Sequence, residues 1–401
     1  MASYRAMVNV VILAVALACA LALAYPRLSQ ATLWRATVTP LASIIGSGFL
    51  VLGPVLHASY GWAAPLAMAA LCLCAWLFGA AIRSNIRALE ASPERCAAAR
   101  ALETAASWTL AFAYVVSVAY YLNLLGAFGV SLTEVDDRFH ARALTSCVFV
   151  LILFVGVFYG FGALERLEQA SVSVKLAIIA GLLAGLAAHF GAAATAGALV
   201  AAPVTLSPWH GLTLAFGLIV TVQGFETSRY LGARYDAPTR IRSMRLAQLL
   251  SAGVYLVYIG LLSYSFAPGA LGLDETAIID MIRVVAPVLP AMLVAAALSA
   301  QFSAAVADTG GSGGLIEELT GGRVPARAGY ALLVAIGLAL TWTADVFEII
   351  SYASRAFALY YALQSAIAAL STARAAPGRA AGFVALACLG LAMALLGRSA
   401  E

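Results

Sequence analysis

Long apolar stretches follow one another along the whole chain, separated by short segments that are rich in arginine, acidic residues, glycine and proline. An α-helix needs about 20 mostly apolar residues to cross the ~30 Å hydrocarbon core of a bilayer, and most of these stretches reach that length. The pattern predicts about twelve transmembrane helices, near residues 7–25, 36–57, 60–84, 104–130, 143–162, 169–190, 208–230, 243–266, 279–305, 324–343, 345–371 and 379–397. We therefore expect an all-α polytopic membrane protein that forms a single membrane domain over residues 1–401.

Composition indicates that the bilayer is the main solvent of the chain. Hydrophobic residues make up 63% of the sequence and charged residues only 10%, whereas a soluble domain carries about 25% charged residues. The arginines behind the net charge of +4 collect in alternate loops, such as residues 83–100 and 234–245. Basic residues mark cytoplasmic loops, so their placement indicates orientation in the membrane and does not indicate nucleic acid as a partner.

The intervening connections are neutral or acidic, as at residues 134–137 and 274–280, and we expect them to face outward. An even number of spans then places both termini outside the plasma membrane, which is the inner membrane in a bacterium. The stretch at 7–25 has an alternative interpretation as a secretory signal, because small residues close it around Ala22 and Ala24. Such a signal would start inside, which conflicts with the direction that the loop charges assign to the next span.

No pattern typical of an enzyme or a metal centre appears in the sequence. The six cysteines lie mostly within apolar stretches, and the four histidines are scattered without ligand spacing. A glycine-rich phosphate loop that ends in Lys-Ser or Lys-Thr is also absent, which argues against an ATP-driven pump. Apart from a coupling ion, we expect no cofactor, no bound metal and no enzymatic activity.

A weak internal symmetry relates the two halves of the chain. A shift of about 176 positions places the five predicted helices within residues 36–190 on the five within residues 208–371, which is a kind of repeat found in secondary transporters. Because five is an odd number, the second set crosses the membrane in the opposite direction, so the repeat is inverted. The helices at 7–25 and 379–397 fall outside the repeat, as an additional N-terminal helix and a C-terminal helix.

The same shift aligns Gly48-Phe49 with Gly224-Phe225, in the opening helix of each repeat. Small residues surround the first pair and Pro54 follows it, so that helix is poorly supported there. A break at membrane depth is tolerated where it lines a cavity or is buried in protein, and paired breaks mark the binding sites of transporters. The alternative is that these small residues only let two helices pack closely.

Three short motifs carry a resemblance to a known family. Residues 44–54 are similar to the glycine-serine-glycine signature in the first core helix of the amino acid, polyamine and organocation (APC) transporter superfamily. Residues 223–226 resemble the Gly-Phe-Glu element of its sixth core helix, and residues 236–240 resemble the loop that follows. The resemblance covers about residues 36–371. It implies a LeuT-like fold of five plus five inverted helices, with broken first and sixth core helices, and transport by alternating access.

For the site, the resemblance implies a substrate carboxylate held by amides near Gly46, Ser47 and Gly48, with the substrate's amine near carbonyl groups of the two breaks. Aromatic side chains could close over the substrate, although aromatics in membrane bundles also serve packing alone. The predicted substrate-binding residues are Ile45, Gly46, Ser47, Gly48, Phe49, Tyr120, Tyr121, Phe216, Val220, Gln223, Gly224 and Phe225. The additional first helix, the short chain and Arg234 depart from the family pattern and leave the substrate open.

Two ionisable residues are predicted to couple transport to protons, since charges at membrane depth are costly and usually functional. Lys175 is the only lysine in the chain, and a desolvated lysine can release a proton near neutral pH, whereas an arginine cannot. It resembles a lysine that occupies the second sodium site in some relatives; the alternative is a side chain that extends to the cytoplasmic surface. Glu226 matches a glutamate that couples gating to protonation in some relatives, and its alternative is a structural ion pair with Arg229.

Ser303 and Asp308 are candidates for an ion site or a gate near the inner end of one core helix. The glycine-rich run at 310–314 could unwind or hinge that helix. Asp308 has an alternative interpretation as an ordinary carboxylate at the membrane surface, and sodium is an alternative coupling ion through Ser303.

The predicted function is secondary active transport, coupled to protons, of amino acids or related small organic amines or acids. A receptor or sensor of the same fold that binds without transporting is an alternative. A channel is another, although the polar residues cluster around two breaks instead of lining a continuous pore. The expected partners are a small-molecule substrate and the lipid bilayer.

Overall fold

The computed structural model describes residues 2–46, 48–91, 96–158, 165–267 and 274–400, and the regular elements among them are helices. The α-helices are α1 (Ala2–Ala24), α2 (Pro26–Ser29), α3 (Thr32–Ile44), α4 (Gly48–Tyr60), α5 (Ala64–Ala91), α6 (Ala97–Val130), α7 (Arg138–Phe158), α8 (Glu165–Thr195), α9 (Pro208–Gly217), α10 (Ala237–Ser263), α11 (Ala277–Val285), α12 (Leu289–Leu319), α13 (Ala326–Thr343), α14 (Val346–Thr372) and α15 (Pro377–Leu396). The 3-10 helices are η1 (Gly61–Ala63), η2 (Ile219–Val222) and η3 (Phe225–Ala233).

Nine helical stretches in the described part of the chain are long and apolar enough to cross a membrane, which agrees with the predicted all-α membrane protein. They comprise residues 6–24, 48–91, 97–130, 138–158, 171–195, 237–263, 289–319, 326–343 and 377–396. The stretch at 48–91 contains both α4 and α5, and α3, α9 and α14 are not among the nine. The count of about twelve spans therefore stays a prediction.

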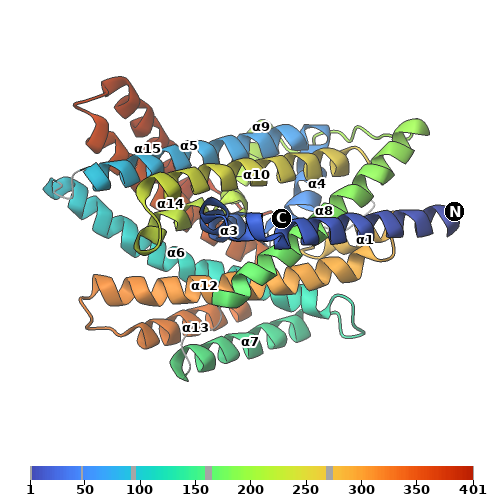
Figure 1. The fold of residues 1–401 in the computed structure, drawn as a ribbon, viewed down its shortest axis with the longest axis horizontal. Coiled ribbons are helices and arrows are strands. Elements are labelled where there is room, and N and C mark those ends of the chain that lie inside the picture. The colour runs from blue at the N-terminus through green and yellow to red at the C-terminus, as the bar shows by residue number, and fades with distance from the viewer. Residues whose placement is uncertain (1, 47, 92–95, 159–164, 268–273, 401) are drawn as a thin grey trace.

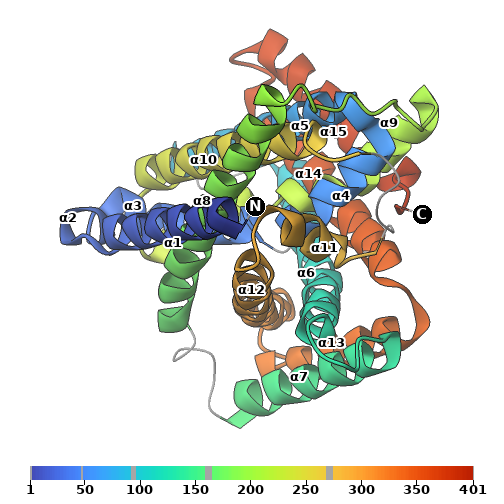
Figure 2. The ribbon, with the colours of Figure 1, turned by 90° about the vertical axis from the view of Figure 1, so that its right-hand side faces the viewer.

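The long helices run side by side in a bundle (Figure 1). α6 packs along both α12 and α14, and α10 packs along α3 and α5. α7 and α13 lie together at one edge of the bundle, beside α6 and α12, whereas α1 lies along α8 (Figure 2). Among the short segments, α3, α4 and η3 contact α10, and η2 contacts α5 and α14.

α1, the additional helix expected from the sequence, packs on α8. Val8 and Ile12 are buried there, and a Cβ atom added to Gly181 of α8 would lie 3.0 Å from the carbonyl oxygen of Ile12. Other large apolar side chains of α1, such as Val10 and Leu17, are exposed. Since apolar side chains are stable in hydrocarbon, α1 has one face for α8 and one face suited to lipid.

α4 continues as helix through Gly53 and Pro54, where the sequence suggested poor support for a helix. The Tyr258 ring of α10 lies against this turn, and a Cβ atom on Gly53 would come within 2.2 Å of its hydroxyl oxygen. Gly53 thus gives space to a neighbouring helix. The expectation that Pro54 contributes to the break is wrong, because the interruption lies before Gly48.

α12 also continues as helix through the glycine-rich run at 310–314, so the predicted unwinding is wrong. A Cβ atom on Gly311 would lie 3.2 Å from the ring of Tyr114 in α6, and one on Gly313 would clash with α13. Small residues let helices approach closely in a membrane bundle, which is their role here. The predicted span at 279–305 comprises two helices, α11 and the first half of α12.

Candidate functional site

The helix predicted to open the first repeat is interrupted between α3 and α4. α3 ends at Ile44, the backbone of Ile45 leaves the helical region with φ −83° and ψ 60°, and α4 begins at Gly48. Ser47 lies outside the described residues. A helix end leaves carbonyl groups on one side and amides on the other without partners inside the helix. Ile45 and Gly48 are both buried, so these backbone groups lie in the protein interior.

The helix predicted to open the second repeat is interrupted after α9. α9 ends at Gly217, the short η2 leads to an extended Gln223, and Gly224 has a φ of 116° before η3 begins. Such a positive φ is readily adopted only by glycine. Both interruptions expected from the sequence are present, and the second is longer than the Gly-Phe pair suggested.

The two interruptions touch each other. A Cβ atom on Gly48 would lie 3.0 Å from the Cα atom of Thr221, and one on Gly224 would lie 2.5 Å from the Cβ atom of Ser43. Because Gly48 has no side chain, the second interrupted segment can approach it, and because Gly224 has none, the first interrupted segment can approach that residue. The close packing considered as an alternative from the sequence does occur, and it is what brings the two broken segments together.

Tyr255 of α10 links the two interruptions through its side chain. Its hydroxyl oxygen lies 2.8 Å from the carbonyl oxygen of Ile44 and 2.6 Å from that of Thr221, within hydrogen-bond reach of both. The side chain is fully buried. One phenol thus supplies a donor to carbonyl groups from both interruptions.

Ser354 of α14 has a similar role within the second interruption. Its hydroxyl donates a 2.6 Å hydrogen bond to the carbonyl oxygen of Gly217 and accepts one of 3.1 Å from the amide of Val220. Val220, a predicted substrate-binding residue, therefore has a paired amide. Neither Ser354 nor Tyr255 was singled out from the sequence, because a polar residue in an apolar helix gives no local sign of a distant partner.

Tyr120 and Tyr121 of α6, two of the predicted substrate-binding residues, lie beside the interruptions. The Tyr120 hydroxyl oxygen would be 2.8 Å from a Cβ atom on Gly48. The Tyr121 hydroxyl accepts a 2.9 Å hydrogen bond from Nε2 of Gln223. Both rings are buried, so two consecutive tyrosines of α6 lie against the interrupted segments in the protein interior.

The three predicted phenylalanines are all buried. Phe49 packs on two tyrosine rings of α10, with centroid distances of 4.3 and 5.5 Å. Phe225 stacks on the ring of Tyr361 in α14 at 5.1 Å. Phe216 lies at the end of α9. Phe49 and Phe225 therefore anchor the interrupted segments to α10 and α14.

Glu226 is fully buried directly after the second interruption. Its Oε2 atom accepts hydrogen bonds from the amide of Gly224 and from the hydroxyl of Tyr361, each 2.9 Å long. The predicted alternative, an ion pair between Glu226 and Arg229, is wrong for the residues that the structure describes. Arg229 instead pairs with Glu103 of α6.

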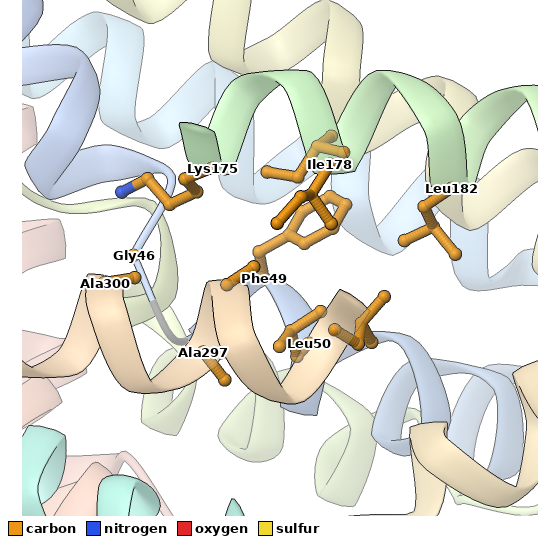
Figure 3. A pocket seen from close by; sticks show the side chains of 11 residues that line it. Gly46, Phe49, Leu50, Lys175, Ile178, Leu182, Ala297 and Ala300 are labelled. Atoms are coloured by element: carbon orange, nitrogen blue, oxygen red, sulfur yellow. The ribbon is translucent and has the colours of Figure 1, made fainter. Parts of the chain in front are cut away.

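Lys175 is 3% exposed, and its Nζ atom donates a 2.8 Å hydrogen bond to the carbonyl oxygen of Ala42 near the end of α3. The alternative of a side chain that extends to the membrane surface is therefore wrong. Figure 3 shows Lys175 of α8 beside the loop at Gly46, where it lines a small cavity together with Ala297 and Ala300 of α12. This cavity of about 20 Å³ is apolar and has room for about one water molecule, not for an amino acid.

Asp308 is buried in α12 and accepts a short hydrogen bond from the hydroxyl of Ser117 in α6. This contact does not fit the alternative of a carboxylate at the membrane surface. Ser303 differs, because its hydroxyl donates a 3.1 Å hydrogen bond to the carbonyl oxygen of Ala300 in its own helix. The structure therefore brings Asp308 against a neighbouring helix and leaves Ser303 bonded within α12.

A larger and more polar cavity of about 350 Å³ lies where α6 and α13 end and α7 and α14 begin. Arginines and carboxylates line it together, namely Arg138, Arg142, Asp274, Glu275, Asp345 and Glu348. None of them was predicted as a site residue. Its volume suits a small polar solute, and it lies at the end of the bundle that the loop charges predict to face outward.

Two comparisons relate this chain to known proteins. Residues 26–397 match a family model described as an APC superfamily transporter. An uncharacterized protein of Aquifex aeolicus (strain VF5) is 42% identical over 352 residues, which are 86% of this chain and 85% of that protein. The stretch matched by the family model also includes Lys175, Glu226 and Asp308.

Proposed function

Because the chain belongs to the APC superfamily of transporters, we propose that it is a secondary active transporter that moves a small solute by alternating access. Family membership and the apolar helices together make it a multi-pass membrane protein. The proposed solute is an amino acid or a related small organic amine or acid.

The observation that carries this proposal is the contact between two helix interruptions in the protein interior. Amides at the start of α4 suit a carboxylate, and carbonyl oxygens at the end of α3 suit an amine. An amino acid carries both groups on one carbon atom. Tyr255 already reaches the carbonyl groups of Ile44 and Thr221, so an entering amine would compete with this hydroxyl for the same oxygens.

The proposed architecture has about twelve spans, with α3 to α8 and α9 to α14 as two inverted repeats of five. Two features support it. Each proposed repeat opens with an interrupted helix, and the two interruptions lie against each other. α1 and α15 stand outside the repeats in this proposal.

Proton coupling is proposed to act through Lys175 and Glu226. Lys175 bonds to the carbonyl group of Ala42 beside the first interruption, and Glu226 bonds to the amide of Gly224 in the second. A change of protonation at either side chain alters a hydrogen bond to the backbone of an interrupted segment. Binding or release of a proton at these side chains would therefore change the backbone geometry of the proposed solute site. Coupling to sodium through Ser303 has less support, because that hydroxyl donates within its own helix.

The loop charges support an orientation with both termini outside the plasma membrane, which is the inner membrane in a bacterium. In this orientation the charged cavity at α7 and α14 lies at the outer face. It would then offer a solute its first polar contacts.

Uptake by the purified protein in liposomes tests the proposed function. We expect saturable accumulation of an amino acid that depends on an imposed proton gradient and disappears when a protonophore collapses the gradient. Binding without uptake would indicate a receptor or sensor, and flux that does not saturate would indicate a channel. Either outcome would refute the transporter.

A further inference from the structure

Gln301 of α12 is a buried polar side chain whose amide forms no hydrogen bonds within the described residues. It is 0% exposed, and neither its amide oxygen nor its amide nitrogen has a hydrogen-bond partner among the described residues. Buried polar groups are normally paired, and unpaired ones call for an explanation. The buried Gln248, by contrast, is bonded at both ends of its amide: its Oε1 accepts from Arg83, and its Nε2 donates to the carbonyl oxygen of Ala75.

Gln301 lies in the part of α12 whose neighbouring residues, Ala297 and Ala300, line the small cavity at the first interruption. Ala297, one turn earlier, lines the small cavity beside Gly46 (Figure 3). Asp308, seven residues later and hence on the same helix face, bonds to Ser117 of α6. Gln301 therefore lies on the side of α12 that is shared by this cavity and α6.

Two hydrogen bonds define the register of α6 against α12. Ser117 pairs with Asp308, and the hydroxyl of Ser312 donates to the carbonyl oxygen of Ala111. Residue numbers thus rise along α6 as they fall along α12, so the helices are antiparallel. Starting from the Ser117–Asp308 pair, seven residues forward along α6 is Leu124 and seven residues back along α12 is Gln301. In this register Gln301 and Leu124 therefore lie at the same height in the bundle.

Leu124 belongs to the turn of α6 that follows Tyr121, the residue that lies between the interruptions. The Tyr121 ring is 4.0 Å from where a Cβ atom of Gly46 would lie, and its hydroxyl binds Nε2 of Gln223. Oε1 of Gln223 is also buried without a partner among the described residues. Unpaired amide atoms therefore occur both in the second interruption and on the α12 wall near the first.

We propose that Gln301 is a specificity-determining residue of the solute site and that it binds a neutral group with both a donor and an acceptor, such as the carboxamide of a glutamine-like or asparagine-like amino acid. This inference rests on the proposed function, because it assigns a solute class to the same site. A glutamine side chain offers an acceptor oxygen and an N–H₂ donor, and a second carboxamide pairs with both at once.

Other solute groups leave part of the Gln301 amide unpaired. A carboxylate accepts from the nitrogen but offers nothing to the oxygen, and an ammonium group does the reverse. An alkyl side chain leaves both atoms buried without partners, which is the costly case. A site with such a group therefore favours carboxamides over hydrocarbon side chains of similar size.

Thermal unfolding of the full-length protein in detergent tests this inference with a glutamine-to-leucine pair of variants. Gln301→Leu removes an unpaired amide, so its Tm without solute should rise. Gln248→Leu, the matched control, removes an amide that is bonded at both its oxygen and its nitrogen, so its Tm should fall. The solute probes are glutamine, glutamate, leucine and lysine at one pH. For the wild type, glutamine should give the largest Tm increase, and Gln301→Leu should weaken its binding by about tenfold or more.

The outcomes separate this inference from the proposed function. If Gln301→Leu lowers Tm without solute and keeps the solute ranking of the wild type, Gln301 is structural and the inference is refuted, while the transporter stands. A wild type that binds and accumulates leucine or lysine but not glutamine also refutes the inference alone. If none of the four solutes binds or is taken up, the amino acid proposal and the inference fall together.

Discussion

Replacing Tyr255 by phenylalanine removes one hydroxyl group from the place where the two interruptions meet. That oxygen lies 2.8 Å from the carbonyl oxygen of Ile44 and 2.6 Å from that of Thr221. Phenylalanine keeps the buried ring and its packing on Phe49, at a centroid distance of 5.5 Å, so the substitution isolates the hydrogen bonds. Because the two carbonyl groups belong to different interrupted segments, the loss affects both segments at once.

The expected cost follows from the burial of these carbonyl groups. A hydrogen bond contributes about 1 kcal/mol net, and a buried acceptor left without a partner costs about 1–3 kcal/mol. One hydroxyl proton serves the two oxygens, so one bond is present at a time. We expect the free energy of unfolding of Tyr255→Phe to fall by about 1–3 kcal/mol, measured as a lower Tm of the purified protein in detergent.

Tyr258→Phe, about one turn further along α10, is the matched control for Tyr255→Phe. Its ring also packs on Phe49, at 4.3 Å, but its buried hydroxyl has no hydrogen-bond partner among the described residues. Removing that hydroxyl should leave Tm unchanged or raise it, because an unpaired buried polar group is unfavourable. Equal losses in the two variants, or no loss in Tyr255→Phe, would contradict a linking role for Tyr255.

Three other substitutions address the solute site and its coupling. Gly224→Ala places a side chain on a backbone with φ 116° and within 2.5 Å of Ser43, so Tm and solute affinity should both fall, and an unchanged affinity would place the site elsewhere. Lys175→Ala removes the donor to the backbone beside the first interruption and should abolish uptake driven by a proton gradient while some solute binding remains; unchanged pH dependence of uptake would exclude coupling through this residue. Glu226→Gln removes the titratable group that Tyr361 contacts and should flatten the dependence of uptake on pH, whereas a profile like that of the wild type would assign Glu226 a structural role.

The interruptions could be predicted from the sequence because helix propensity is a local property. Gly48 and Gly224 occur at one offset, and glycine weakens a helix wherever it lies inside one. The apolar character of the long helices was predictable for a similar reason, since a run of about 20 apolar residues is visible without any knowledge of contacts. Lys175 and Glu226 were recognisable as charges within apolar surroundings, although their bonding partners were not.

Contacts between distant segments were beyond such local reasoning. Ser354 bonds to a backbone amide 134 positions away, and nothing in its own helix indicates that partner. The glycine-rich run at 310–314 was misjudged because composition does not distinguish a glycine that ends a helix from one that admits a neighbouring ring. Gly311 lies under Tyr114, and the helix continues.

Gly48 and Gly224 combine the two roles that the sequence presented as alternatives. Each lies at or beside a break in its helix, and each leaves a space that atoms of the other interrupted segment occupy, at 3.0 Å from Thr221 and 2.5 Å from Ser43. A side chain at either glycine would therefore displace both segments. The same contact holds the carbonyl groups of Ile44 and Thr221 within reach of one hydroxyl, that of Tyr255. Tyr255 can therefore reach both interrupted segments only because the segments pack closely.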